Sequence, residues 1–257
     1  MAKVRRSVPE SVKLAGAGSL RQAMTAIAAA FKESSGVSVS AEFGASGLLY
    51  EKIAAGGGAH VFASADVEHP AALAKNGKAA PPVVFAHNGL CALARPEVRI
   101  TPDTLLAVLL DPAIKLGTST PKSDPCGDYA WELFRKAEGL RPGARSVLEA
   151  KALQLTGGPN SAPPPVDRSV YGALLSERKA DLMLVYRTNA RQAAREVPGL
   201  QVVDLPEALA VRTDAGLTVL HGSPPAAYRF ALFVLSQAGQ GILAQFGFTA
   251  PGAQASP

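Results

Sequence analysis

Cysteine, aromatic residues and long apolar runs are all scarce in this sequence of 257 residues. Its two cysteines, Cys91 and Cys126, form no CxxC pair and no repeated Cys/His spacing, which argues against a structural zinc site. Aromatic residues make up 6% of the chain and do not alternate with basic residues, as a surface that stacks on nucleic-acid bases requires. No apolar run approaches the roughly 18 residues of a membrane-spanning helix. We therefore expect a soluble protein with no nucleic-acid partner and no direct membrane insertion.

A signal peptide is also missing from the start of the chain. Residues 1–10 are charged, contain Pro9 and lack an apolar stretch. The sequence leaves two interpretations open here, a cytoplasmic protein or the mature form of an exported one. We expect residues 1–10 and 252–257 to be disordered tails. The formal net charge of +5 suits a protein that attracts a small anion.

Short apolar strands alternate with helical patterns along the whole chain, which predicts an α/β fold with parallel-rich, mixed sheets. Val12–Ala15 is strand-like, and Leu20–Phe31 carries apolar residues at helical spacing. No stretch resembles a linker, so we expect one lobe to be inserted into the other. The predicted first lobe comprises residues 11–86 and 205–251, and the second comprises residues 87–204.

Two predicted strand-to-helix junctions share one design, in which small residues precede a serine and a helix. They are Gly16–Leu20, with Ser19, and Gly44–Leu48, with Ser46. Unpaired N–H groups and the positive dipole end at a helix start favour an anion, and a serine hydroxyl adds a donor. In an open α/β sheet, ligands bind at these ends of the strands. Each serine alone could simply cap its helix, but the repeated design favours a shared ligand.

The second half of the chain offers further donors. Gly117–Tyr129 again runs from a strand through a polar loop to a helix start. Arg168 begins a helix after a Pro-rich loop, where its guanidinium could hold an oxyanion or form a surface salt bridge with a neighbouring acid. Tyr186 ends a strand, where it either donates its hydroxyl into a cleft or packs against the strand end. The sequence alone leaves these alternatives open.

No catalytic motif is convincing. The serines lack a GxSxG elbow, and neither HExxH, GxGxxG nor GxxxxGK[ST] occurs. His60, Asp66 and His69 are more typical of a surface loop than of a metal site. Cys126 has no histidine nearby in the sequence to act as its base. We therefore predict no catalytic residue, no cofactor and no residue that ligates a metal cation directly.

Six segments occur in an order that is typical of one family. They are Ala15–Leu20, Phe43–Gly47, Val61–Asp66, Asp181–Tyr186, Gly239–Leu243 and Phe246–Phe248. Together they resemble the periplasmic molybdate-binding proteins that serve ABC transporters, and the resemblance spans Val12 to Pro251.

The resemblance implies a two-lobed type II periplasmic binding fold that closes on a tetrahedral dianion, molybdate or tungstate, in a cleft between the lobes. The ligand-binding positions of the family fall on Ser19, Ser46, Cys126 through its backbone N–H, Arg168 and Tyr186. It further implies a periplasmic, monomeric protein without catalytic activity, whose partner is the membrane permease of an ABC transporter.

Two positions depart from the family pattern. Arg168 places a formal charge where the family uses neutral donors, and Cys126 places a thiol where alanine is common. Both departures concern the identity of the anion more than the fold. They leave open a binder of sulfate, phosphate or a small carboxylate, or a cytoplasmic ligand-sensing or enzymatic protein on the same fold.

Overall fold

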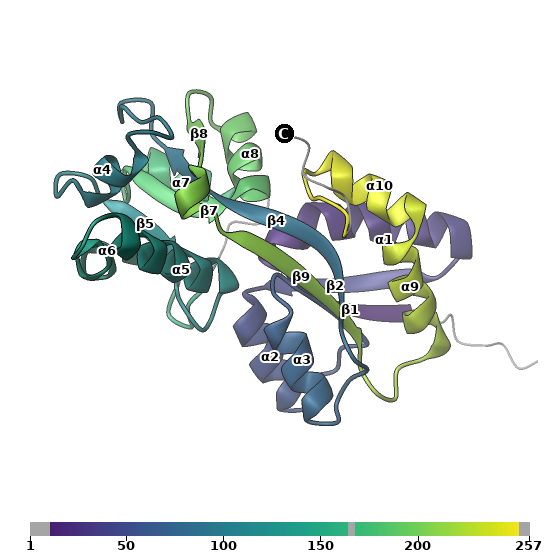
Figure 1. The fold of residues 1–257 in the computed structure, drawn as a ribbon. Helices are drawn as coiled ribbons and strands as arrows, with labels where there is room; N and C mark the ends of the chain where they lie inside the picture. The colour runs from purple at the N-terminus through teal and green to yellow at the C-terminus, as the bar shows by residue number, and fades with distance from the viewer. Residues whose placement is uncertain (1–10, 164–167, 252–257) are drawn as a thin grey trace, which may run out of the picture. The chain divides into compact units, whose positions relative to one another are not determined.

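The computed structural model describes residues 11–163 and 168–251, and the chain divides into two compact units (Figure 1). The first unit contains the chain up to Gly44, Leu49–Ala86 and the chain from Ala215 on, and the second contains Ala45–Leu48 and His87–Asp214. The predicted tails, residues 1–10 and 252–257, lie outside the described residues.

The boundaries between the units fall inside strands. The chain enters the second unit between Ala86 and His87, within β4 (Val83–Ala94). It returns between Asp214 and Ala215, within β9 (Arg212–Val219), whereas the sequence placed this boundary after residue 204. Apolar patterning did not mark this second boundary, because β9 runs across it without interruption.

The sheet of the first unit contains β2 (Ser38–Gly44), β1 (Ser11–Ala17), β3 (Val61–Ser64) and β9, in that order. β1 is parallel to both neighbours, and β9 is antiparallel to β3. The helical elements of this unit are η1 (Gly18–Leu20), α1 (Arg21–Ser35), α2 (Ser46–Ala54), whose first turn belongs to the second unit, α3 (Glu68–Lys75), α9 (Pro225–Leu235) and α10 (Gln237–Gln245).

The buried face of α1 is the one that the apolar spacing predicts. Leu20, Met24 and Ile27 are fully buried, and Phe31 is 3% exposed. The ring of Phe31 lies edge-on to Phe230 of α9, with centroids 5.3 Å apart. This packing fixes the position of α1, which follows β1 after the short helix η1.

The sheet of the second unit has the order β4, β7 (Leu182–Tyr186), β5 (Leu116–Ser119) and β6 (Leu153–Thr156), and β8 (Gln201–Asp204) pairs with β4. β5 is parallel to β6 and β7, whereas β4 is antiparallel to β7 and β8. The helical elements of this unit are α4 (Leu105–Leu110), α5 (Pro125–Leu140), α6 (Ala144–Lys151), α7 (Val170–Ser176), α8 (Arg187–Glu196) and η2 (Glu207–Leu209).

All five residues of β7 are buried, which is typical of a central strand covered on both faces. The mixed, parallel-rich sheets with flanking helices confirm the predicted fold class. Sequence patterning did not predict α6 or β6, both of which are short. No helix in the described ranges is long and apolar enough to cross a membrane.

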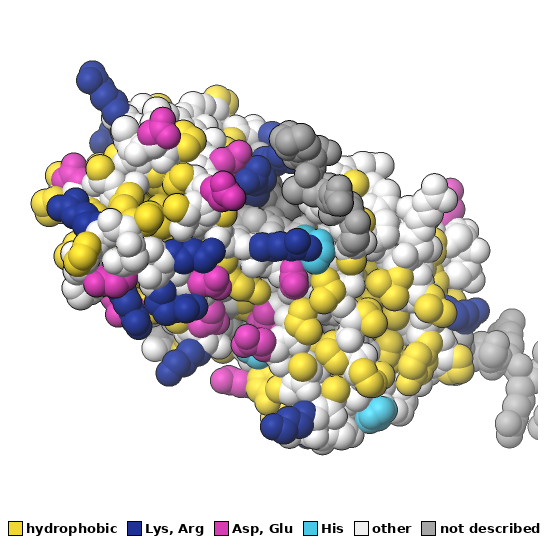
Figure 2. Space-filling model, viewed as in Figure 1, with side chains coloured by type: hydrophobic (Ala, Val, Ile, Leu, Met, Phe, Trp, Pro, Cys, Tyr) yellow, Lys and Arg dark blue, Asp and Glu magenta, His cyan; other side chains and the backbone are white. Residues whose placement is uncertain are grey.

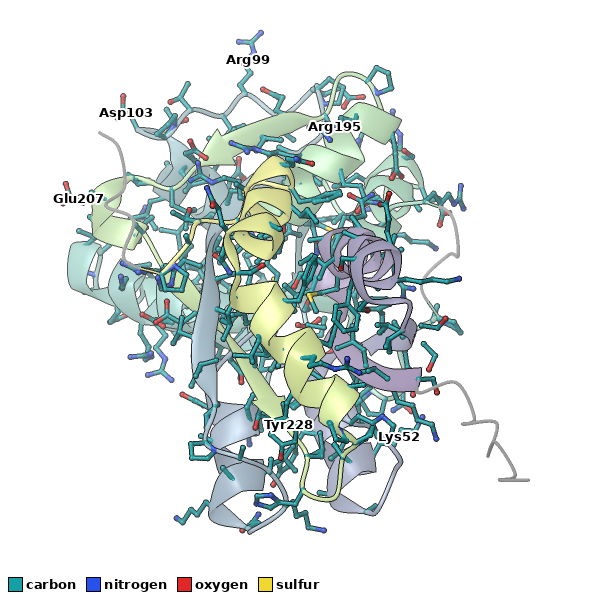
Figure 3. All side chains as sticks on the ribbon, turned by 90° about the vertical axis from the view of Figure 1, so that its right-hand side faces the viewer. Lys52, Arg99, Asp103, Arg195, Glu207 and Tyr228 are labelled. Carbon is teal, nitrogen blue, oxygen red and sulfur yellow. The ribbon has the colours of Figure 1, made fainter. Side chains whose placement is uncertain are left out.

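The packing of α9 against α1 makes a testable prediction. Phe230 is fully buried, whereas Leu232 on the same helix is 67% exposed. Tyr228, also on α9 and labelled in Figure 3, is likewise exposed. Phe230→Ala should lower the free energy of unfolding by about 3–5 kcal/mol, because it leaves a cavity against Phe31. Leu232→Ala should change it by less than about 0.5 kcal/mol. Denaturant titration of both variants measures this, and equal losses would contradict the packing described.

Candidate functional site

The carboxyl ends of β1 and β2 lie side by side in the first unit. The two strands are parallel, and their register pairs Ala17 with Gly44. A Cβ built on Gly18 would lie only 3.8 Å from the carbonyl oxygen of Gly44, so the two chain segments remain close beyond the strand ends. Ser19 follows Ala17 by two residues, and Ser46 follows Gly44 by two residues. Both predicted junctions therefore start from one edge of the sheet.

Ser19 does not occupy a capping position. The N-cap of α1 is Leu20, without a side-chain cap, and Ser19 lies half-buried within η1. Ser46 is the first residue of α2 and is 1% exposed. Helix capping, the alternative role considered for both residues, is therefore not what the structure shows for Ser19.

Cys126 and Tyr186 come together in the second unit, at the ends of the parallel strands β5 and β7. The Cys126 thiol donates to the carbonyl oxygen of Leu184 at 3.8 Å, two residues before Tyr186. The ring of Tyr186 lies edge-on to Tyr129, with centroids 6.3 Å apart. Both predicted site residues thus belong to one buried cluster beneath the start of α5.

Asp124 is a residue of this cluster that sequence reasoning missed. Its Oδ1 accepts a hydrogen bond from the Cys126 N–H at 3.0 Å, which makes Asp124 the N-cap of α5. The Asp-Pro pair before the helix was the available signal, because Asp favours the N-cap and Pro the first helical position. An anion that uses the Cys126 N–H must therefore displace a carboxylate.

Arg168 lies apart from this cluster. It is exposed and directly precedes Ser169, whose hydroxyl oxygen accepts from the Gly172 N–H at 3.3 Å and caps α7. The guanidinium makes no hydrogen bond or ion pair with any residue that the structure describes. The structure therefore brings Cys126 and Tyr186 together but does not join Arg168 to them.

The buried groups beneath α5 are held in their neutral forms. Burial raises the pKa of the Cys126 thiol well above its usual range, and the Asp124 carboxylate raises it further. Burial likewise raises the pKa of Cys91 to about 12 and that of the Tyr171 hydroxyl still higher. Tyr171, which belongs to the same buried core cluster as Cys91, is a second residue that sequence reasoning missed. A protonated, buried thiol is a poor nucleophile.

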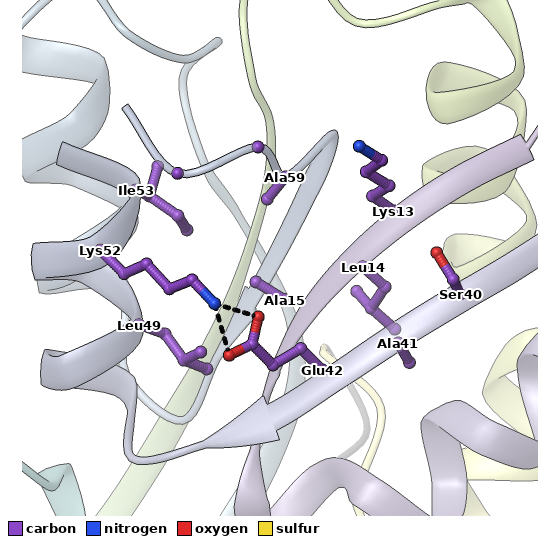
Figure 4. Close-up of a pocket in the computed structure, with 12 residues that line it drawn as sticks. Lys13, Leu14, Ala15, Ser40, Ala41, Glu42, Leu49, Lys52, Ile53 and Ala59 are labelled. Carbon is purple, nitrogen blue, oxygen red and sulfur yellow. Dashed lines mark hydrogen bonds and ion pairs between the residues drawn. The ribbon is translucent and has the colours of Figure 1, made fainter. Parts of the chain in front are cut away.

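A separate pocket of about 300 Å³ lies in the first unit, on the sheet face beside α2 (Figure 4). Lys52 of α2 crosses it to both carboxylate oxygens of Glu42, at 2.7 Å each. The third charged residue that lines the pocket is Lys13, near the start of β1. The pocket therefore extends away from the strand ends that carry the serine junctions, and its one carboxylate is already paired.

The histidines and acids considered as metal ligands have other partners. His69 Nδ1 lies 2.5 Å from Asp66 Oδ2, while His60 Nδ1 accepts from the Lys13 N–H at 3.1 Å. The described part of the chain contains no group of three or more His, Cys, Asp or Glu residues that could hold a metal ion. On the face shown in Figure 2, basic side chains are interspersed with acidic ones.

Comparison with known proteins places the chain in a family. The sequence profile of the bacterial extracellular solute-binding proteins matches residues 12–249. The chain belongs to that family. A relative from Pasteurella multocida, itself uncharacterised, is 36% identical over 79% of this chain and 84% of its own length. The molybdate-binding protein ModA of Mycobacterium tuberculosis is 30% identical over 94% of this chain and 85% of its own length.

Solved structures of solute-binding proteins share the fold. The sulfate-binding protein SubI of Mycobacterium tuberculosis matches 95% of this chain and 88% of its own, with a TM-score of 0.78 and 20% identity. The periplasmic molybdate-binding protein of Azotobacter vinelandii matches 93% of this chain and 99% of its own, with a TM-score of 0.74 and 20% identity. These matches confirm the predicted two-lobed periplasmic binding protein fold.

The buried thiols make a prediction about reactivity. Because the thiolate is the reactive form and burial raises both pKa values, Cys91 and Cys126 should resist a thiol reagent at pH 8 in the native protein. Both should react within minutes in denaturant, at two thiols per chain. A colorimetric thiol assay measures both states. Rapid reaction of either cysteine in the native protein would contradict the buried, protonated environment.

Proposed function

We propose that this solute-binding protein is the periplasmic component of an ABC importer and captures a tetrahedral oxyanion, molybdate or tungstate. The observation that carries the proposal is the pairing of Ala17 with Gly44 at the ends of β1 and β2. Because of this pairing, the segments that carry Ser19 and Ser46 leave the sheet at the same edge. We expect both hydroxyls to donate to the same anion there. The ModA relative, which covers 94% of this chain, supports the same class of ligand.

Groups of the second unit would complete the anion site. Cys126 would contribute its backbone N–H and Tyr186 its hydroxyl, both from the cluster at the ends of β5 and β7. The Asp124 carboxylate, which accepts from the Cys126 N–H, would have to turn away as the anion arrives. The α5 N-terminus stabilises a negative charge, whether that of Asp124 or that of the solute. The solute must therefore bind there more strongly than the Asp124 carboxylate does. We therefore expect a dianion rather than a monoanion to be preferred.

A second candidate ligand is another anion, with sulfate, phosphate and small carboxylates as the alternatives. The exposed Arg168 favours this candidate, because a guanidinium pairs with carboxylate or phosphate through two parallel N–H···O bonds. The structural match to a sulfate-binding protein is compatible with it. If Arg168 binds the solute, discrimination by cavity size should be weaker than with neutral donors alone.

No catalytic step belongs to this proposal. Burial raises the pKa of the Cys126 thiol and keeps it protonated, so it is a poor nucleophile. A binder would function by reversible capture and delivery to a permease, as a monomer in the periplasm. It would need no cofactor besides the solute itself.

The proposal predicts which anions bind and which residues they need. Molybdate and tungstate at about 100 times their dissociation constants should stabilise the protein by about 2.7 kcal/mol in a thermal-shift assay. Ser19→Ala and Ser46→Ala should each weaken binding about 10- to 100-fold in isothermal titration, because each removes one donor to a charged acceptor. Sulfate should bind more weakly, since a smaller anion leaves donors unsatisfied.

Ser34→Ala is the matched control, because the Ser34 hydroxyl lies on α1 and donates only to the Phe31 carbonyl oxygen. It should leave affinity unchanged. Arg168→Gln separates the two candidates, because a large loss of affinity would make the guanidinium a ligand-binding group. Absence of a stability shift with every oxyanion tested would overturn the proposal.

A further inference from the structure

One histidine lies where the chain passes between the two units. His87 on β4 and Asp214 on β9 are the residues of the second unit next to the two crossings within these strands. Next to them, the Leu90 N–H of β4 donates to the carbonyl oxygen of Val211, the residue just before β9, at 3.4 Å. These contacts therefore join the two segments in which the chain passes from one unit to the other.

His87 makes a contact through each ring nitrogen. Its Nδ1 lies 2.6 Å from Asp214 Oδ1, and its Nε2 lies 2.6 Å from Arg212 Nη2. Arg212 Nε lies 3.5 Å from the same Asp214 oxygen. The imidazole is largely buried, at 11% side-chain exposure, whereas Asp214 and Arg212 are exposed at their outer ends. These two β9 residues are the charged groups in contact with the ring in the described part of the chain.

The hydrogen-bond chemistry fixes the form of the ring. A guanidinium only donates, so Nε2 of His87 must accept from Arg212, and the ring proton must lie on Nδ1, where it donates to Asp214. This arrangement requires a neutral imidazole. A second ring proton would place an N–H on Nε2, directly opposite a guanidinium N–H. Two donors and two positive charges would then face each other at 2.6 Å, so Arg212 must move away.

We infer that His87, Asp214 and Arg212 form a proton-sensitive link between the two crossing strands, and that protonation of His87 releases its Arg212 end. Histidine is the side chain that ordinarily changes charge between pH 5 and 8. The His87–Asp214 contact survives protonation, because a charged imidazole still donates to a carboxylate. Acidification therefore loosens the link by one contact without removing it, and His87 acts as a positioning residue for the crossing strands.

Hydrogen exchange of the Leu90 amide in the ligand-free protein tests this inference. We expect its protection, corrected for the intrinsic rate, to fall about fivefold between pH 7.5 and pH 5.5, as the loss of one net hydrogen bond implies. In His87→Gln the change should disappear. The Gln amide can still accept from Arg212 and donate to Asp214, but it does not titrate. Nitrogen chemical shifts of the imidazole should show the Nδ1–H form at high pH.

Two further variants keep the test decisive. His221→Gln replaces an exposed histidine after β9 and should behave as the wild type. Arg212→Gln should abolish the pH response even if His87→Gln fails to fold, because no cation then opposes the second ring proton. The same fivefold fall in His87→Gln, or no fall in the wild type, would overturn the inference.

A second readout rests on the proposed function. The molybdate dissociation constant of the wild type should vary with pH over the same range more than that of His87→Gln. Because the exchange measurement needs no ligand, failure to bind molybdate leaves its result intact. A pH-dependent exchange without molybdate binding would overturn only the proposed function, whereas molybdate binding with pH-independent exchange would overturn only the link.

Discussion

The parallel pairing of β1 with β2 is the constraint on which the proposed site depends. Seven residue pairs are in register, from Ser11 with Ser38 to Ala17 with Gly44. Because the register is fixed along the whole length of both strands, the two chains leave the sheet together. Beyond the strand ends the two segments stay close, since a Cβ built on Gly18 would lie 3.8 Å from the Gly44 carbonyl oxygen. A slip of one residue would separate the two junctions and turn their side chains to the opposite face.

Electrostatics in the second unit set a different requirement. The α5 N-terminus attracts negative charge, yet it is already capped by the Asp124 carboxylate. A solute that takes this position must exceed the carboxylate in charge or in the number of hydrogen bonds that it accepts. Under the proposed function, this competition would favour a strongly charged ligand at the start of α5.

The sequence predicted most of the fold because its signals are local. Apolar spacing located α1, and small residues before Ser19 and Ser46 located the junctions that follow β1 and β2. The return between units inside β9 was not located from sequence, because pairing across a sheet depends on residues far apart in the chain. Asp124 and Tyr171 were missed for a related reason. Their roles depend on the Cys126 N–H and on a buried core cluster, which only the folded chain assembles.

Diffraction from crystals grown with tungstate, recorded at a tungsten absorption edge, would show whether Ser19 and Ser46 hold the anion. The account predicts one strong anomalous peak, with tungstate oxygens about 2.7–3.0 Å from the hydroxyl oxygens of Ser19 and Ser46. The same anion should contact the Cys126 N–H, with the Asp124 carboxylate turned away. An ordered tungstate bound elsewhere, with both serines in contact with water alone, would contradict the account.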